Sequence, residues 1–172
     1  MEAERAQLYP FLSRPGAKAT VIQRTEGVWL ITPDGRKILD AAGGAIVANI
    51  GHGRSEVAQA YARAATEATY LVPPFVTESR VRLVERLRRS WLPPEITRAV
   101  FTSGGSESMD AAIRLARQHH LSAGRPKRWK VIGRQLSYHG TTLATLAIGG
   151  HEKRRVGFEP WLAQLPKAPA CY

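Results

Sequence analysis

The fold is decided by the stretch Val100-Phe-Thr-Ser-Gly-Gly-Ser-Glu-Ser-Met-Asp-Ala-Ala-Ile-Arg-Leu-Ala-Arg117. Residues 99–102, at its start, are of the types that suit a buried strand. Gly104 and Gly105 interrupt that run. Apolar residues then recur with the spacing of an amphipathic helix, at Met109, Ala112, Ile113 and Ala116. The stretch therefore predicts a strand, a glycine loop and a helix, in this order.

This arrangement is suited to binding an oxyanion such as a phosphate. The first N–H groups of a helix have no partners inside the helix, and the helix dipole is positive at this end. Small residues let the anion approach, and the hydroxyl groups of Ser103 and Ser106 are additional donors. The alternative is a structural βα turn with Ser106 as the N-cap. The loop has neither the third glycine of a dinucleotide fingerprint nor the Gly-Lys-Ser/Thr of a Walker loop.

The composition is that of one globular domain, or of a piece of a larger one. The chain has 172 residues, of which 44% are hydrophobic. Cys171 is the only cysteine, which excludes a disulfide framework and a cysteine-based zinc site. The N-terminus is charged and does not resemble a secretory signal, and no apolar run is long enough to span a membrane. We therefore expect a cytoplasmic enzyme that does not bind membranes.

The chain is strongly basic, with 25 Lys and Arg against 14 Asp and Glu and a formal net charge of +11. Such a balance can indicate nucleic-acid binding. Here the basic residues are scattered, and their short clusters at residues 86–89, 125–128 and 153–155 fit solvated surfaces. No zinc-finger or RNP pattern accompanies them. We expect no nucleic-acid partner, and a non-catalytic basic binding module is the alternative from another functional class.

A β-hairpin is expected N-terminal to the deciding stretch. Apolar runs at residues 27–32 and 36–39 flank Pro33-Asp34-Gly35, in which proline presets φ and glycine supplies a positive φ. Residues 40–53 follow and are rich in small side chains, with His52 between two glycines. No second histidine or carboxylate at ligand spacing accompanies His52. We expect a structural turn histidine and no metal site.

The remaining patterns predict helices and one more strand. Ser55 is expected to cap a helix that buries Val57 and Tyr61, and Thr77 is expected to cap a helix that ends near Trp91. The C-terminal part predicts a strand at residues 129–132, a small-residue helix that ends near residue 148 and an irregular tail from residue 158. A strand, a helix and a strand with a connection of this length imply a right-handed parallel β-α-β unit.

Four segments occur in an informative order: the hairpin with Asp34-Gly35 and Asp40, Gly51-His-Gly53, Phe101-Thr-Ser-Gly-Gly-Ser-Glu107 and Ser137-Tyr-His-Gly140. Together they resemble the class III aminotransferases, which are pyridoxal-phosphate enzymes of the fold-type I group. The resemblance covers nearly the whole chain. It implies an α/β fold, an incomplete fold-type I transferase with an N-terminal segment and the first part of a mainly parallel-sheet large domain. Residues 1–55 would belong to the small domain, and residues 56–172 would begin the large cofactor-binding domain.

By position, the resemblance implies which residues bind the cofactor. Gly105 and Ser106 would hold its phosphate through backbone N–H groups and the Ser106 hydroxyl, and Glu107 would support the loop from behind. Tyr138 would stack on the pyridine ring; otherwise it is an ordinary buried tyrosine. The wall around the ring would be shaped by His139 and Gly140.

The resemblance also implies a substrate pocket, to which Ile46 and Phe75 would contribute. The chain departs from the family pattern at Gly104, where a serine is usual, and at Ser108, where an alanine is usual. The first departure removes a hydroxyl group and leaves the backbone donors in place. The second is expected to be neutral.

The implied function is the transfer of an amino group from an amine or ω-amino acid to a 2-oxo acid, with pyridoxal 5'-phosphate as cofactor and a homodimer as the full-length form. The family also uses a lysine that forms a Schiff base with the cofactor, and a carboxylate at the pyridinium nitrogen, both well beyond Gly140. None of the six lysines matches that position, so no catalytic residue is assigned. We expect a fragment that is inactive alone and only partly folded or poorly soluble, unless a separate chain supplies the rest. An aminomutase, racemase or decarboxylase of the same fold is the alternative.

Overall fold

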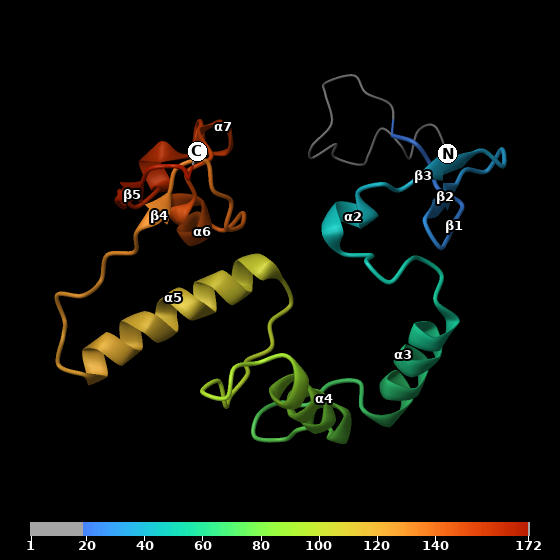
Figure 1. Cartoon of the computed structure of the whole chain (residues 1–172), viewed down its shortest axis with the longest axis horizontal. Coiled ribbons are helices and arrows are strands. Elements are labelled where there is room, and N and C mark those ends of the chain that lie inside the picture. The colour runs from blue at the N-terminus through green and yellow to red at the C-terminus, as the bar shows by residue number, and fades with distance from the viewer. Residues whose placement is uncertain (1–18, 172) are drawn as a thin grey trace. The chain divides into compact units, whose positions relative to one another are not determined.

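The computed structural model describes residues 19–171. They divide between two compact units that meet in the chain at Arg82 and Leu83 (Figure 1). Unit 1 holds residues 19–82, and unit 2 holds residues 83–171. In this described range, no helix combines the length and the apolar character that crossing a membrane requires.

Unit 1 begins with a three-stranded antiparallel sheet. Its strands are β1 (Arg24–Glu26), β2 (Trp29–Ile31) and β3 (Lys37–Leu39). Trp29 lies opposite Leu39 in the second pair, and Gly35 in the connecting turn has a φ of 82°, which glycine adopts without steric cost. The predicted hairpin is confirmed. β1 was not predicted, because its three residues are polar and give no apolar pattern.

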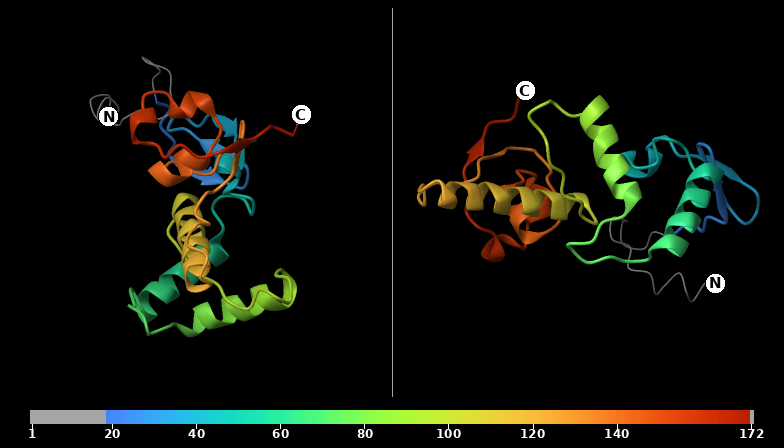
Figure 2. Two further views of the ribbon diagram at one scale, coloured as in Figure 1. Left: turned by 90° about the vertical axis from the view of Figure 1, so that its left-hand side faces the viewer. Right: turned by 90° about the horizontal axis from the view of Figure 1, so that it is seen from below.

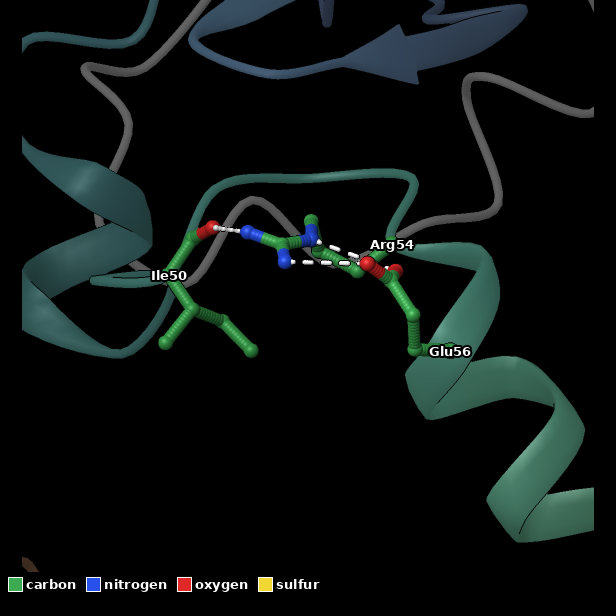
Figure 3. A network of polar contacts seen from close by, with 3 residues as sticks. All are labelled: Ile50, Arg54 and Glu56. Carbon is green, nitrogen blue, oxygen red and sulfur yellow. Dashed lines mark hydrogen bonds and ion pairs between the residues drawn. The ribbon is translucent and has the colours of Figure 1, made fainter.

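The helices of unit 1 are α2 (Gly43–Ile46), α3 (Ser55–Glu67) and the first part of α4 (Glu78–Ser90), which continues into unit 2. The expectation that Ser55 caps α3 is wrong, because Arg54 is the residue before the helix. The Arg54 guanidinium donates to the Ile50 carbonyl at 3.2 Å and to both carboxylate oxygens of Glu56, at 3.1 and 3.4 Å (Figure 3). A carboxylate in the first turn of a helix also complements the helix dipole.

The apolar face of α3 is exposed. Val57 and Tyr61 are 41% and 76% accessible, so their expected burial is wrong. The reason is that no other helix or strand among the described residues of unit 1 packs closely against α3. The cap of α4 is as predicted, since the Arg80 N–H donates to the Thr77 hydroxyl at 3.3 Å.

Unit 2 consists of one long helix and a small α/β subdomain. The helix is α5 (Gly105–Ser122), which is straight in Figure 1 and in the right-hand view of Figure 2. The subdomain contains β4 (Gly133–Arg134), α6 (Leu143–Ile148), α7 (Glu152–Arg155), the 3₁₀ turn η1 (Glu159–Trp161) and β5 (Lys167–Ala168). β4 and β5 pair in parallel. The α/β class and the small-residue helix are confirmed.

Two predicted strands do not form in the described chain. Residues 99–102 and 129–132 are not strands, and Val100 and Ile132 are 78% and 69% exposed. A strand forms by pairing with another strand, and neither segment pairs with one among residues 19–171. The expected β-α-β unit between them is therefore wrong. Instead, β4 begins at Gly133 and pairs with β5, in the tail that was expected to be irregular.

The core of unit 2 surrounds α6, with Thr145, Ala147, Ile148 and Leu162 buried. The last carbonyls of a helix lack partners inside the helix and lie at the negative end of its dipole. Two cations bind them here. Arg155 donates to the carbonyls of Ala147 and Gly149, both at 3.0 Å, and Lys167 donates to that of Ala147 at 2.7 Å. These bonds fix α6 against α7 and β5.

Candidate functional site

The glycine loop leads directly into α5. Gly104 precedes the helix with an extended backbone, so Gly104 and not Ser106 is the N-cap. The carboxylate of Glu107 accepts a hydrogen bond from the Ser103 N–H at 2.8 Å, which confirms that Glu107 supports the loop. A Cβ added at Gly104 or Gly105 would meet no atom within 4 Å. The first N–H groups of α5 therefore lie at a place that an anion can approach.

Ser106 joins this loop to the segment that contains Tyr138. Its Oγ accepts a hydrogen bond from the Thr141 N–H at 3.0 Å, across 35 positions of sequence. Helices α5 and α6 also pack together here (Figure 2). Because Oγ is the acceptor in this bond, the hydroxyl hydrogen of Ser106 remains available to donate to another group.

Gly140 lies inside this junction. A Cβ at this position would come within 2.5 Å of Ser106 Oγ and 2.7 Å of Thr145 Oγ1. Its φ of 140° is also one that side chains rarely adopt. Two of the segments singled out in the sequence therefore meet at a point where only a glycine fits.

Tyr138 follows β4 on the subdomain side of the junction. It is 55% exposed, so the alternative of an ordinary buried tyrosine is wrong. The guanidinium carbon of Arg154 lies 4.7 Å from the centroid of its ring. His139, the next residue, is half-buried. An exposed aromatic ring thus stands near a helix start with free donors.

Sequence reasoning missed three residues of this arrangement. Thr141 contributes a backbone N–H, which every residue except proline has, so no sequence signal could have singled it out. Thr145 is fully buried, and its hydroxyl group occupies the space that a Cβ at Gly140 would need. Arg154 belongs to the basic cluster at residues 153–155, which indicated charge but not a contact with Tyr138.

The predicted pocket residues Ile46 and Phe75 lie in unit 1, whereas the residues above belong to unit 2. Ile46 is 80% exposed at the end of α2 and lines a cavity of about 340 Å³. Phe75 is 63% exposed on the loop before α4. Their contribution to a substrate pocket stays a prediction.

His52 has the structural role that its sequence context predicts. Its Nε2 lies 2.8 Å from the carboxylate of Asp40, and its backbone exchanges two hydrogen bonds with Gly27. The bond from His52, together with the backbone N–H of Gly44, holds the pKa of Asp40 below its usual range. Among residues 19–171, no group of three or more His, Cys, Asp or Glu is placed to hold a metal ion.

Known proteins are similar to this chain in both sequence and fold. Residues 12–172 match the family model Aminotransferase class-III. The chain belongs to this family. It is 39% identical over 146 residues to a probable aminotransferase of Mycobacterium tuberculosis (84% of this chain, 31% of the relative). It is 32% identical over 147 residues to an acetylornithine aminotransferase of Agrobacterium fabrum (86% of this chain, 36% of the relative).

A solved structure agrees with the family assignment. The (S)-enantioselective ω-transaminase from Thermomicrobium roseum is 33% identical and superposes with a TM-score of 0.88 over 99% of this chain and 40% of the transaminase. The class III resemblance and the fold-type I assignment are therefore confirmed. The chain spans about a third of the length of the curated relatives it matches.

Proposed function

We propose that this chain supplies the phosphate-binding and ring-binding parts of an enzyme that moves an amino group from an amine or ω-amino acid to a 2-oxo acid with pyridoxal 5'-phosphate. The observation that carries the proposal is the hydrogen bond between Ser106 and Thr141. It joins the start of α5 to the segment that bears Tyr138. A ligand in which a phosphate is attached to an aromatic ring needs these two features close together.

The start of α5 fits a phosphate dianion. Gly105 and Ser106 would donate their backbone N–H groups, and Ser106 would add its hydroxyl. The helix end contributes up to about 2 kcal/mol to binding an anion in a partly buried site. No Cβ at Gly105 would obstruct the approach.

The second segment fits an aromatic ring. Tyr138 would stack on the pyridine ring, and stacked aromatic pairs gain about 0.5–1.5 kcal/mol beyond the area they bury. His139 and Gly140 would shape the wall beside it, since Gly140 brings the backbone close to Ser106. When bound, the cofactor supplies an electron sink for chemistry at the carbon that bears the amino group. The part of this chain is to bind and orient that cofactor.

The proposal extends to the whole enzyme. Ile46 and Phe75 would line the substrate pocket, residues 1–55 would belong to the small domain and residues 56–172 to the large one. The names of two relatives, acetylornithine aminotransferase and ω-transaminase, support an ω-amino donor. Exposed aromatic side chains such as Trp91, at 78%, support a homodimer, and the single cysteine supports a cytoplasmic location.

No lysine of this chain is proposed as catalytic. Lys167 is the one held most firmly within the described range, but its Nζ donates to the carbonyls of Ala147 and Leu165. Burial and the neighbouring Arg155 lower the pKa of Lys167, and its bonds give it a structural role. We expect the chain to bind the cofactor without transferring amino groups on its own.

The test is a titration of the full chain with pyridoxal 5'-phosphate, followed by the absorbance of the bound cofactor, with inorganic phosphate as competitor. Ser106→Ala should weaken binding of both ligands by at least about tenfold, since a hydrogen bond to a charged group contributes about 1.5–3 kcal/mol. Ser122→Ala, at the opposite end of α5, is the matched control. Equal affinities of the two variants, or no cofactor binding by the wild-type chain, would refute the proposal.

A further inference from the structure

One face of the Tyr138 ring is covered by a cation. The guanidinium carbon of Arg154 lies 4.7 Å from the ring centroid, within the range of about 6 Å over which a cation is attracted to an aromatic face. The residue is nevertheless 55% exposed. A ring has two faces, so the guanidinium covers one and leaves much of the rest accessible.

The backbone on both sides of this contact is held by hydrogen bonds. The Leu136 N–H donates to the Gly150 carbonyl at 3.2 Å, and the Gly150 N–H donates to the Ser137 carbonyl at 3.1 Å. These bonds fasten the residues before Tyr138 to the residues before α7. The backbone that carries Tyr138 is therefore held close to the start of α7.

The helix that carries Arg154 is anchored as well. Arg155, its neighbour in α7, donates to the carbonyls of Ala147 and Gly149 at the end of α6. Among residues 19–171, Arg154 forms no ion pair with a carboxylate. Its place over the ring is thus not explained by an ion pair.

We propose that Arg154 is a positioning residue, which holds the Tyr138 ring from behind so that the opposite face stacks on the aromatic ring of the cofactor. The proposal rests on the function proposed above. A guanidinium suits this role because it is planar and lies flat on an aromatic ring, whereas an ammonium group is compact and strongly hydrated. Arg154 would act only through Tyr138 and would leave the phosphate contacts of Ser106 unchanged.

The first experiment compares two ligands. In the full chain, Arg154→Ala should weaken binding of pyridoxal 5'-phosphate about two- to fivefold, the range expected for an exposed cation–π contact. Binding of inorganic phosphate, which reports only on the start of α5, should not change. Arg154→Lys should recover part of the loss, and Lys153→Ala, an exposed residue of the same helix, should have no effect.

The outcomes separate the possible roles of Arg154. Weaker binding of both ligands would mean that Arg154 stabilises the fold in general. Tighter cofactor binding by Arg154→Ala would mean that the guanidinium occupies the ring face that the cofactor needs. Either result, or unchanged cofactor affinity, overturns the proposal. If the wild-type chain binds phosphate but not the cofactor, the proposed function is refuted, and this inference, which rests on it, is refuted as well.

A second experiment tests the contact without any cofactor. The ring current of Tyr138 should shift the δ protons of Arg154 upfield in NMR spectra of arginine-labelled protein, and Tyr138→Leu should abolish the shift. In a double-mutant cycle, Arg154→Ala should have no further effect on cofactor affinity once Tyr138 is leucine. Additive losses would show that Arg154 acts independently of Tyr138, which would overturn the proposal.

Discussion

Gly43 and Gly44 of unit 1 and Gly140 of unit 2 are required for different reasons. In unit 1, Cβ atoms at Gly43 and Gly44 would come no closer than 3.8 and 4.0 Å to another atom, but their φ angles are 54° and 57°. In unit 2, a Cβ at Gly140 would lie 2.5 Å from the hydroxyl of Ser106. Unit 1 therefore needs these glycines for backbone conformation. Unit 2 needs Gly140 because two segments that are far apart in the sequence lie too close together for a side chain.

This difference separates a local requirement from a tertiary one. A left-handed backbone conformation concerns a single residue. Glycine adopts it readily, and asparagine and aspartate adopt it less often. A close approach depends on what another part of the chain places there, and no side chain relieves it. Substitutions at Gly43 or Gly44 should therefore change stability by small amounts. Substitutions at the junction of unit 2 should change both stability and ligand binding.

The largest effect is expected for Gly140→Ala. Overpacking costs about 1–3 kcal/mol, and the backbone conformation adds to that cost. The added methyl group would separate Ser106 from Thr141 and disrupt the proposed phosphate site. We expect destabilisation of about 3 kcal/mol in urea unfolding and at least about tenfold weaker binding of inorganic phosphate.

Gly104→Ala is the matched control for that substitution. Gly104 lies in the same loop, has an extended backbone and has no atom within 4 Å of its Cβ position. It should therefore cost no more than about 1 kcal/mol, the loss expected for alanine at an N-cap. If both variants lose stability and phosphate affinity equally, the close contact at Gly140 has no special importance.

The second effect concerns two arginines, one in each unit. Arg155 is half-buried and binds the last carbonyls of α6, so Arg155→Gln should cost up to about 2 kcal/mol. Lys153→Gln, exposed on the same helix, is the control. Arg54 of unit 1 is exposed, and Arg54→Gln should cost less than Arg155→Gln. Equal melting temperatures for the Arg155 and Lys153 variants would contradict a capping role.

The elements that the sequence predicts correctly have local causes. Pro33, Asp34 and Gly35 specify their own turn, and Thr77 caps the helix that begins at the next residue. The segments at residues 99–102 and 129–132 have strand-forming side chains but no strand beside them in the described chain. Side-chain type indicates that a segment can be a strand. It does not supply the neighbour that a strand needs.

The candidate site also combines features that can be predicted from the sequence with contacts that cannot. Ser106 and Tyr138 belong to recognisable motifs, so the resemblance to a family is enough to imply their roles. The bond between Ser106 and the Thr141 backbone, and the contact of Arg154 with Tyr138, join positions that are 35 and 16 residues apart. Such contacts depend on tertiary packing, and neither leaves a pattern in a single sequence.

The third-largest effect is expected from the left-handed backbone conformation of Ile46 in unit 1. Ile46 has a φ of 68°, which is unfavourable for a β-branched residue, whereas the adjacent Val47 has a φ of −104°. Both side chains are about equally exposed, at 80% and 82%. Ile46→Gly should therefore be more stable than Val47→Gly by about 1–2 kcal/mol, because only the first relieves a left-handed side chain. Urea unfolding of the two variants measures this difference, and equal stabilities would mean that α2 is not strained.

The smallest effect is the pH dependence of the polar pair in unit 1. The hydrogen bond from His52 lowers the pKa of Asp40 in the folded chain. An unfolded aspartate titrates at about 3.9, so between the two pKa values the unfolded state binds more protons. The stabilisation from this pair is fully present above about pH 3.9 and is lost as the pH falls through the folded pKa. The Asp40→Asn variant should lack that part of the acid-induced decline in urea unfolding, while Asp110→Asn in unit 2 should retain it. Identical declines in the wild-type chain and Asp40→Asn would show that the His52 bond does not stabilise the fold.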